Sequence, residues 1–184
     1  MLLLEDALYP RRLKATYDPP LVGYVRGDLE FVIEPGIAAV GTRHRTPYGS
    51  GRAERRAKDL AAQGLVITSG MATASTPRAI AAQSLPKARR SRYLAPALTS
   101  SLPKKTRVSR NRFLGGALIW GISLGTLAAP QNFPICNRIL SGTSIGVLVV
   151  QAAEYSSGRI TARTALEQNR DVFAVSGNVT NTNS

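Results

Sequence analysis

The sequence predicts an α/β protein with an open, mostly parallel sheet and helices on both of its faces. Residues 37–40 and 65–68 are short apolar runs, as in strands that are covered on both faces. Residues 48–63, between these runs, place apolar side chains at helical spacing. The same order of strand, helix and strand returns near the end of the chain, over residues 146–150, 160–168 and 171–175. Two such units, each with a right-handed crossover, predict parallel strand pairs within one sheet.

Prolines interrupt the lead-in segment, which we take as residues 1–35. Pro10 and the Pro19–Pro20 pair come before the stretch LVGYVRG at residues 21–27, which predicts a short strand bounded by turns. The α/β domain then runs over residues 36–184. Its middle, residues 72–112, supplies none of the strands expected between the two units, so we expect the central part of the sheet to be degraded.

The predicted helix at residues 48–63 has one apolar face, formed by Ala53, Ala57, Leu60 and Ala61. Its arginines lie mostly off this face, as in a helix with one side in solvent. Gly64 follows directly and predicts the end of the helix, because glycine is the usual residue after a last helical turn.

Length and composition fit a single globular domain of 184 residues, 43% of them hydrophobic. We expect no secretory signal peptide, since Glu5 and Asp6 follow the apolar start, and no uncharged run is long enough to span a membrane. One cysteine, Cys136, and one histidine, His44, leave no disulfide framework and little material for a metal site. These features predict a cytoplasmic protein without a metal or another cofactor.

The net charge of +13 suggests an anionic partner such as nucleic acid, but its distribution is uneven. Residues 73–112 contain ten of the 24 lysines and arginines and no acidic residue. The rest of the chain has 14 basic against 11 acidic residues, a net charge of only +3. Since a charge run is most often a solvated face, composition alone supports nucleic-acid binding weakly.

Small, hydroxyl and basic residues follow the predicted strands at their carboxyl ends, where ligands bind in open α/β sheets. The run Gly41–Thr42–Arg43 combines room for a close approach, a hydroxyl and a guanidinium that can hold a phosphate in a bidentate way. We expect Ser69–Gly70 to form the matching half of this cradle, facing the start of a following helix, and Asn137–Arg138 adds a further basic corner. The candidate phosphate-binding residues are therefore Gly41, Thr42, Arg43, Ser69, Gly70, Asn137 and Arg138.

Each of these short motifs also has a purely structural explanation. The first two fit strand-terminating turns, Arg138 can cover helix carbonyls, and residues 156–158 fit the N-cap of the last helix. No carboxylate pair, Ser/His/Asp set or Walker loop can be assembled from the sequence. The residues thus predict phosphate recognition without a reaction.

Seven motifs occur in order along the chain: YPRRL, PPLVGYVRG, AVGTR, ITSGMA, APQNFPICNRILSG, GVLVVQAAEYSSGRITARTALEQNR and DVFAVSGNVTN. They resemble the DNA processing protein A family, also called DprA or Smf. That family has Y-P-x-x-L, P-P-x-L, V-G-[ST]-R, S-G-x-A-x-G-I-D, F-P-x-R-N-R-I-[IL]-S-G, V-V-E-A-x-x-x-S-G-[ST]-x-I-T-A and V-F-A-V-P-G. The resemblance covers residues 9–72 and 127–184, and as a joint set it is highly specific.

The middle of the chain does not match, and a shifted reading frame explains the mismatch. When new codons are built from the last base of each codon and the first two bases of the next, residues 73–88 can spell GIDTASHRGAIAAKG. The same shift over residues 90–102 can spell VAVLGTGVDVI. These are the missing G-I-D continuation and the G-x-G-x-D segment of the family. We therefore expect residues 73 to about 102 to be out of frame, and the basic window to result from shifted codons.

Three other positions depart from the family motifs. Cys136 stands where the family has arginine, Gln151 where it has glutamate, and Ser176 where it has proline. We also expect the family's N-terminal helical domain and C-terminal winged helix to be absent. A decayed gene or a misread sequence explains this pattern better than a new function.

The resemblance implies an extended Rossmann-like fold that binds single-stranded DNA in a basic pocket. It also implies a homodimer, without enzymatic activity, that protects incoming strands and helps to load RecA onto them during natural transformation. By motif, Arg43 and Arg138 are carried over as phosphate contacts. The residues of close approach are Gly41, Thr42, Ser69 and Gly70. Cys136 replaces a cation, which should weaken binding and reduce its salt dependence.

Two alternatives stay open. A nucleotide-processing Rossmann enzyme, similar to the lysine-decarboxylase-like phosphoribohydrolases, needs a P-G-G-x-G-T-x-x-E motif, and the chain has no such run. A non-functional pseudogene product would not fold cooperatively, because the shifted segment would replace central strands and bury cations without partners.

Overall fold

The computed structural model describes residues 1–41, 47–70, 116–121, 132–152 and 156–176. Several sequence predictions lie outside these ranges. They concern Thr42, Arg43 and His44, and the segment 73–102 with its proposed shift of frame.

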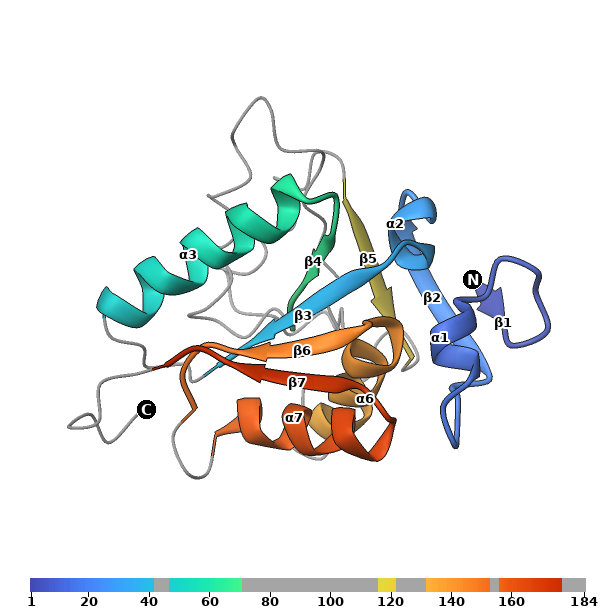
Figure 1. The fold of residues 1–184 in the computed structure, drawn as a ribbon. Coiled ribbons are helices and arrows are strands. Elements are labelled where there is room, and N and C mark those ends of the chain that lie inside the picture. The colour runs from blue at the N-terminus through green and yellow to red at the C-terminus, as the bar shows by residue number, and fades with distance from the viewer. Residues whose placement is uncertain (42–46, 71–115, 122–131, 153–155, 177–184) are drawn as a thin grey trace, which may run out of the picture.

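The central sheet is parallel and has four strands in the order β4-β3-β6-β7. Its members are β3 (Gly36–Val40), β4 (Val66–Thr68), β6 (Gly146–Val149) and β7 (Asp171–Ala174). Figure 1 shows β3 and β6 side by side in the middle of this sheet, although about a hundred residues separate them in the chain. Both predicted strand–helix–strand units are present, and each strand boundary lies within one residue of the predicted one.

Helices cover both faces of the sheet, as predicted. On one face lies α3 (Pro47–Ala62), whose Ala57 and Ala61 pack with Ile67 of β4. On the other lie α6 (Phe133–Thr143) and α7 (Ser157–Glu167), shown below the sheet in Figure 1. Alternate residues of each strand therefore face opposite layers, as the pleat of a strand requires.

The last helix begins at Ser157, three residues before the predicted start. Serine and glycine have low helix propensity, so the sequence pattern placed residues 157–159 in a loop. In the structure, Ser156 has the extended backbone of an N-cap, and Gly158 forms part of the first turn. Packing of this turn on the sheet overrides the local preference.

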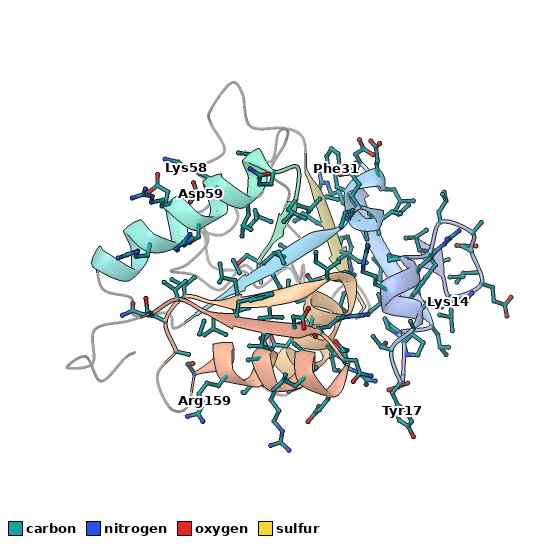
Figure 2. All side chains as sticks on the ribbon, in the orientation of Figure 1. Lys14, Tyr17, Phe31, Lys58, Asp59 and Arg159 are labelled. Atoms are coloured by element: carbon teal, nitrogen blue, oxygen red, sulfur yellow. The ribbon has the colours of Figure 1, made fainter. Side chains whose placement is uncertain are left out.

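Two strands of the lead-in and one strand from the later part of the chain form a second, antiparallel sheet in the order β1-β2-β5. The strands are β1 (Leu2–Leu3), β2 (Val22–Gly27) and β5 (Ala117–Trp120), and the short helices are α1 (Arg11–Lys14) and α2 (Glu30–Ile33). The rings of Tyr24 and Trp120 stack across β2 and β5 with centroids 5.8 Å apart. Figure 2 shows Phe31 on α2 beside β5, and Tyr17 pointing into solvent.

One core cluster joins the lead-in to the parallel sheet. Leu13 of α1 and Phe31 of α2 belong to it together with Ala38 of β3, Leu140 of α6 and Val147 of β6. All five side chains are buried. The lead-in therefore shares one hydrophobic core with the parallel sheet and α6.

Candidate phosphate-binding site at the carboxyl edge of the sheet

The carboxyl ends of neighbouring parallel strands bring three predicted site residues to one edge. Gly41 follows β3, and Ser69 and Gly70 follow β4, its neighbour in the sheet. Ser69 is buried with 4% of its surface exposed, whereas Gly41 and Gly70 are half-buried. We call this place the carboxyl edge, defined by Gly41, Ser69, Gly70, Gln151 and Ser156.

Two helices begin at the carboxyl edge, because α3 follows β3 and α7 follows β6. The first N–H groups of a helix have no partner within the helix and carry partial positive charge. Neither α3 nor α7 has an acidic residue in its first turn. An anion at this edge therefore meets backbone donors, and within the first turns of these two helices no carboxylate repels it.

The first turn of α7 packs directly on the end of β3. A Cβ atom added to Gly158 would lie 3.2 Å from the Cα of Gly41 and 3.3 Å from its backbone nitrogen. These distances are shorter than ordinary van der Waals contact, so a side chain would push the helix away from the strand. The glycine holds the start of α7 against the carboxyl edge.

The first turn of α3 meets the end of β6 through Gln151. A Cβ atom on Gly49 would overlap the side chain of Gln151, a buried residue two positions after β6. The family motif has glutamate at this position, so the present chain has a neutral amide in place of a carboxylate. The carboxyl edge is thereby less negative than the motif predicts.

Ser156 supplies a hydroxyl at the start of α7. It occupies the N-cap position, yet its side chain makes no capping hydrogen bond. Its Oγ is buried and has no hydrogen-bond partner within the described part of the chain. Burying a hydroxyl without a partner is unfavourable, so this group is suited to donate to an oxygen of a bound anion.

Asn137 and Arg138 lie on α6, in the helical layer rather than directly after a strand. Nη1 of Arg138 donates to Oδ2 of Asp18 in the lead-in at 2.7 Å, with 35% of the arginine side chain and 70% of the aspartate exposed. The carbonyl of Arg138 accepts from Nε2 of Gln168 at 3.1 Å. The structural alternative for Arg138 was that its side chain covers helix carbonyl groups. The structure differs, because the guanidinium pairs with Asp18 instead.

Asn137 is buried, and its Nδ2 has no hydrogen-bond partner among the residues that the structure describes. Cys136, next to it, is also buried, and burial raises the pKa of its thiol to about 11. The thiol is therefore protonated at neutral pH and is not a reactive nucleophile.

Sequence reasoning missed the two helical glycines, Gly49 and Gly158, as residues that shape the site. A glycine inside a helix costs stability relative to alanine, so its presence signals a close approach. That signal is imperfect, since Gly51 in the same helix as Gly49 has open space around it.

No cluster of histidine, cysteine and carboxylate side chains that could hold a metal is found in the described ranges. Within the same ranges, none of the helices has the length and apolarity needed to cross a membrane.

Comparisons with known proteins agree with this architecture. The chain is 36% identical over 178 residues to the DNA processing protein DprA of Bacillus subtilis, covering 96% of this chain and 60% of that protein. It is 36% identical over 179 residues to the protein Smf of Escherichia coli, covering 96% of this chain and 48% of the relative. The chain thus spans about half to three fifths of the length of these relatives.

Solved structures match in the same way. The X-ray structure of DprA from Streptococcus pneumoniae superimposes with a TM-score of 0.84 at 27% identity, covering 99% of this chain and 64% of the other. DNA processing protein A from Helicobacter pylori, whose structure is described by its single-stranded DNA binding mode, gives a TM-score of 0.77 at 26% identity, covering 94% and 80% of the two chains.

The family model of DNA recombination-mediator protein A matches residues 1–184. This match is wider than the two blocks of motifs, 9–72 and 127–184, and includes the segment between them. It bears on the family and not on the reading frame. The chain therefore belongs to the DNA recombination-mediator protein A family, which includes the DprA and Smf proteins.

Proposed function

We propose that this chain binds single-stranded DNA through its phosphates at the carboxyl edge. The observation that supports this most is the start of α7, where Gly158 lies against Gly41 and the buried Oγ of Ser156 has no described partner. Together with the start of α3, this arrangement presents backbone and hydroxyl donors at one place. The relative from Helicobacter pylori, described by its single-stranded DNA binding mode, supports the same choice of ligand.

Binding of this kind reads the backbone and not the bases. Donors at helix starts and arginine side chains hold phosphate oxygens, which are the same for every sequence. We place Gly41, Thr42, Ser69 and Gly70 at the close approach of the strand, with Arg43 as a cationic contact. The strand should therefore bind with little sequence preference and with strong dependence on salt.

Arg138 and Asn137 form a second proposed contact with the DNA backbone. The ion pair of Arg138 with Asp18 is partly exposed, and such pairs contribute little to stability. A phosphate can therefore replace Asp18 as the partner of the guanidinium at small cost. This arginine would extend the DNA path from the carboxyl edge toward the lead-in.

The wider role that we propose follows from the family. We infer a cytoplasmic, non-enzymatic mediator that forms a homodimer, protects incoming single strands during natural transformation and helps to load RecA. A nucleotide-processing enzyme remains the alternative, and the lack of a P-G-G-x-G-T-x-x-E run weighs against it.

We further propose that residues 73 to about 102 are read out of frame in this sequence. The support is that one shift restores two family motifs in the correct order. Sequencing the encoding DNA across residues 72–123 tests this directly. One missing or extra base that restores the G-I-D and G-x-G-x-D motifs supports the proposal. If the read is confirmed, the gene carries compensating shifts of frame. Codons that do not spell these two motifs when they are read in the shifted frame would contradict the proposal.

Fluorescence anisotropy of a labelled oligothymidylate tests the DNA-binding function over a series of salt concentrations. We expect the logarithm of the affinity to fall linearly with the logarithm of the salt concentration. Arg138→Gln should weaken binding and lower this slope by about one. Arg163→Gln is the matched control, because Arg163 also pairs with a carboxylate, Glu167, but on the outer surface of α7. No binding by the wild-type chain at low salt would overturn the proposal.

A further inference from the structure

A cavity of about 670 Å³ lies between α3 and the strands β6 and β7. Ile37 and Leu148 belong to its apolar lining, and the stretch from Phe173 to Ser176 lines its β7 side. This volume is within the range of small-molecule sites, about 300–1,000 Å³. The cavity is separate from the carboxyl edge, since none of the five residues that define that edge lines it.

The cavity arises because α3 lies on only part of its face of the sheet. Parallel sheets are usually covered on both faces, and α3 packs on β4 through Ala57 and Ala61. Figure 1 shows α3 along the β4 side of the sheet, away from the outer strand β7. On β7, Phe173 keeps 51% of its surface exposed.

Phe173 offers an aromatic surface to the cavity. A Cβ atom on Gly146 would lie 3.1 Å from Cε2 of Phe173, so the ring rests over the backbone of this glycine on the neighbouring strand. Because Gly146 has no side chain, the ring can lie close to the sheet. A flat aromatic group next to apolar side chains is suited to stack on another ring.

Polar residues line the α3 side of the cavity, and those on the helix recur at helical spacing. Its lining residues include Arg52, Arg56 and Asp59 of α3 and Gln63 directly after this helix. Intervals of four and three residues place the three helical residues along one face of α3, and Figure 2 shows Asp59 on this helix. Arginines bind phosphate, while a carboxylate and an amide can pair with the donors and acceptors of a base.

We propose that this cavity, which we call the α3–β7 pocket, binds one nucleotide unit. Its base stacks on Phe173, and its phosphate pairs with Arg52 and Arg56. An apolar helix from a partner fits less well, because it would bury Arg56 and Asp59 without new hydrogen bonds. The unit can come from a free mononucleotide or from the end of a DNA strand. The pocket reaches Ser176, two residues after the carboxyl end of β7, so a DNA strand held at the carboxyl edge can place its last nucleotide here.

Nuclear magnetic resonance titration of the full ¹⁵N-labelled chain tests the pocket, with 2′-deoxyadenosine 5′-monophosphate as the probe. We expect saturable shifts at the amides of Phe173, Leu148 and Arg56. The same chain is titrated with deoxyadenosine and with inorganic phosphate, and each should bind at least about tenfold more weakly, because it offers only one of the two contacts. Shifts confined to the carboxyl edge, or no saturable shift, would overturn the proposal.

Three variants sharpen this test. Arg56→Gln and Phe173→Leu should each weaken binding of the mononucleotide by about fivefold or more, through loss of a phosphate contact and of stacking. Arg55→Gln is the matched control, since this exposed arginine is on the same helix but does not line the pocket. Equal binding by all three variants would contradict the proposal.

Two further arms identify the source of the nucleotide and separate this site from the DNA-binding edge. If an oligothymidylate shifts the NMR signals of the pocket amides at a lower concentration than the mononucleotide does, the ligand is the end of a DNA strand. If the mononucleotide shifts them at the lower concentration, the ligand is a free nucleotide. Ser156→Asp should weaken binding of the oligonucleotide and leave binding of the mononucleotide unchanged. Loss of mononucleotide binding in this variant would contradict a separate pocket.

Discussion

Gly158 and Gly51 are both glycines inside helices, but only Gly158 faces another backbone. A Cβ on Gly158 would press on Gly41, whereas a Cβ on Gly51 would meet nothing within 4 Å. Gly51→Ala should therefore raise the free energy of unfolding by about 0.5–1 kcal/mol, since alanine favours the helix. Gly158→Ala should lower it, by about 1 kcal/mol or more, because α7 must shift. Urea denaturation measures both, and a stabilised Gly158→Ala variant would show that the contact imposes no constraint.

Tyr9 makes the stability of the protein depend on pH in the alkaline range. Its hydroxyl donates to the carbonyl of Pro20 at 2.7 Å, and burial raises its pKa from 10.0 to about 12. The unfolded chain thus loses this proton at lower pH than the folded chain does. The contribution is complete below pH 10 and is lost as the pH rises toward about 12.

Thermal melts from pH 8 to pH 12 check this prediction against the variant Tyr9→Phe. The variant should lose about 1 kcal/mol at neutral pH with the hydrogen bond, and it should fall less steeply above pH 10. Cys136 also lowers the stability of the folded protein as the pH rises from 9 to about 11, because burial raises the pKa of its thiol as well. An identical decline in wild type and Tyr9→Phe would contradict the role given to Tyr9.

At the scale of secondary-structure elements, β4 is joined to the end of α6 by a buried hydrogen bond. Oγ1 of Thr68 lies 2.9 Å from Oγ of Ser144, which itself donates to the carbonyl of Leu140 at 2.8 Å. Because a serine hydroxyl has one proton, Thr68 is the donor to Ser144. This bond fixes the end of β4, the strand that Ser69 follows.

Thr68→Val keeps the shape of the side chain and removes this donor. It should lower the free energy of unfolding by about 1 kcal/mol, as measured by chemical denaturation. Thr164→Val is the matched control, because its hydroxyl bonds to Ile160 on the surface of α7, where water can replace it. If the two variants lose the same stability, the buried bond has no special contribution.

The sequence allowed some elements to be predicted and not others. The strands of the central sheet were placed within one residue, since buried parallel strands leave continuous apolar runs. The predicted start of α7 was wrong, because Ser157 and Gly158 become helical only through packing on the sheet. The strand Ala117–Trp120 was not predicted, since its pairing with β2 joins residues about ninety positions apart. Local patterns contain no information about such a pairing.

At the scale of the whole molecule, the strand-end rule predicted a part of the candidate site. It brings Gly41, Ser69 and Gly70 together, as the sheet order confirms. It could not predict that Gln151 meets Gly49, because this contact depends on which strands are neighbours. It also could not predict that Arg138 turns toward Asp18, since the lead-in lies far away in the sequence.

The central claim is that the start of α7 holds a DNA phosphate, and a change of charge at Ser156 tests it most directly. Ser156→Asp and Ser156→Asn place side chains of the same shape at the N-cap, and both residues are favourable caps. They differ in one negative charge next to the proposed phosphate. The measurement is the dissociation constant of each variant for a labelled oligothymidylate, by anisotropy, at low and at high salt.

We predict that Ser156→Asp binds at least about tenfold more weakly than Ser156→Asn at low salt, and that salt narrows the difference, because it screens the repulsion. Thermal melts should show the aspartate variant to be at least as stable, since a negative charge favours a helix start. Equal affinity of two folded variants for single-stranded DNA at low salt would contradict the claim.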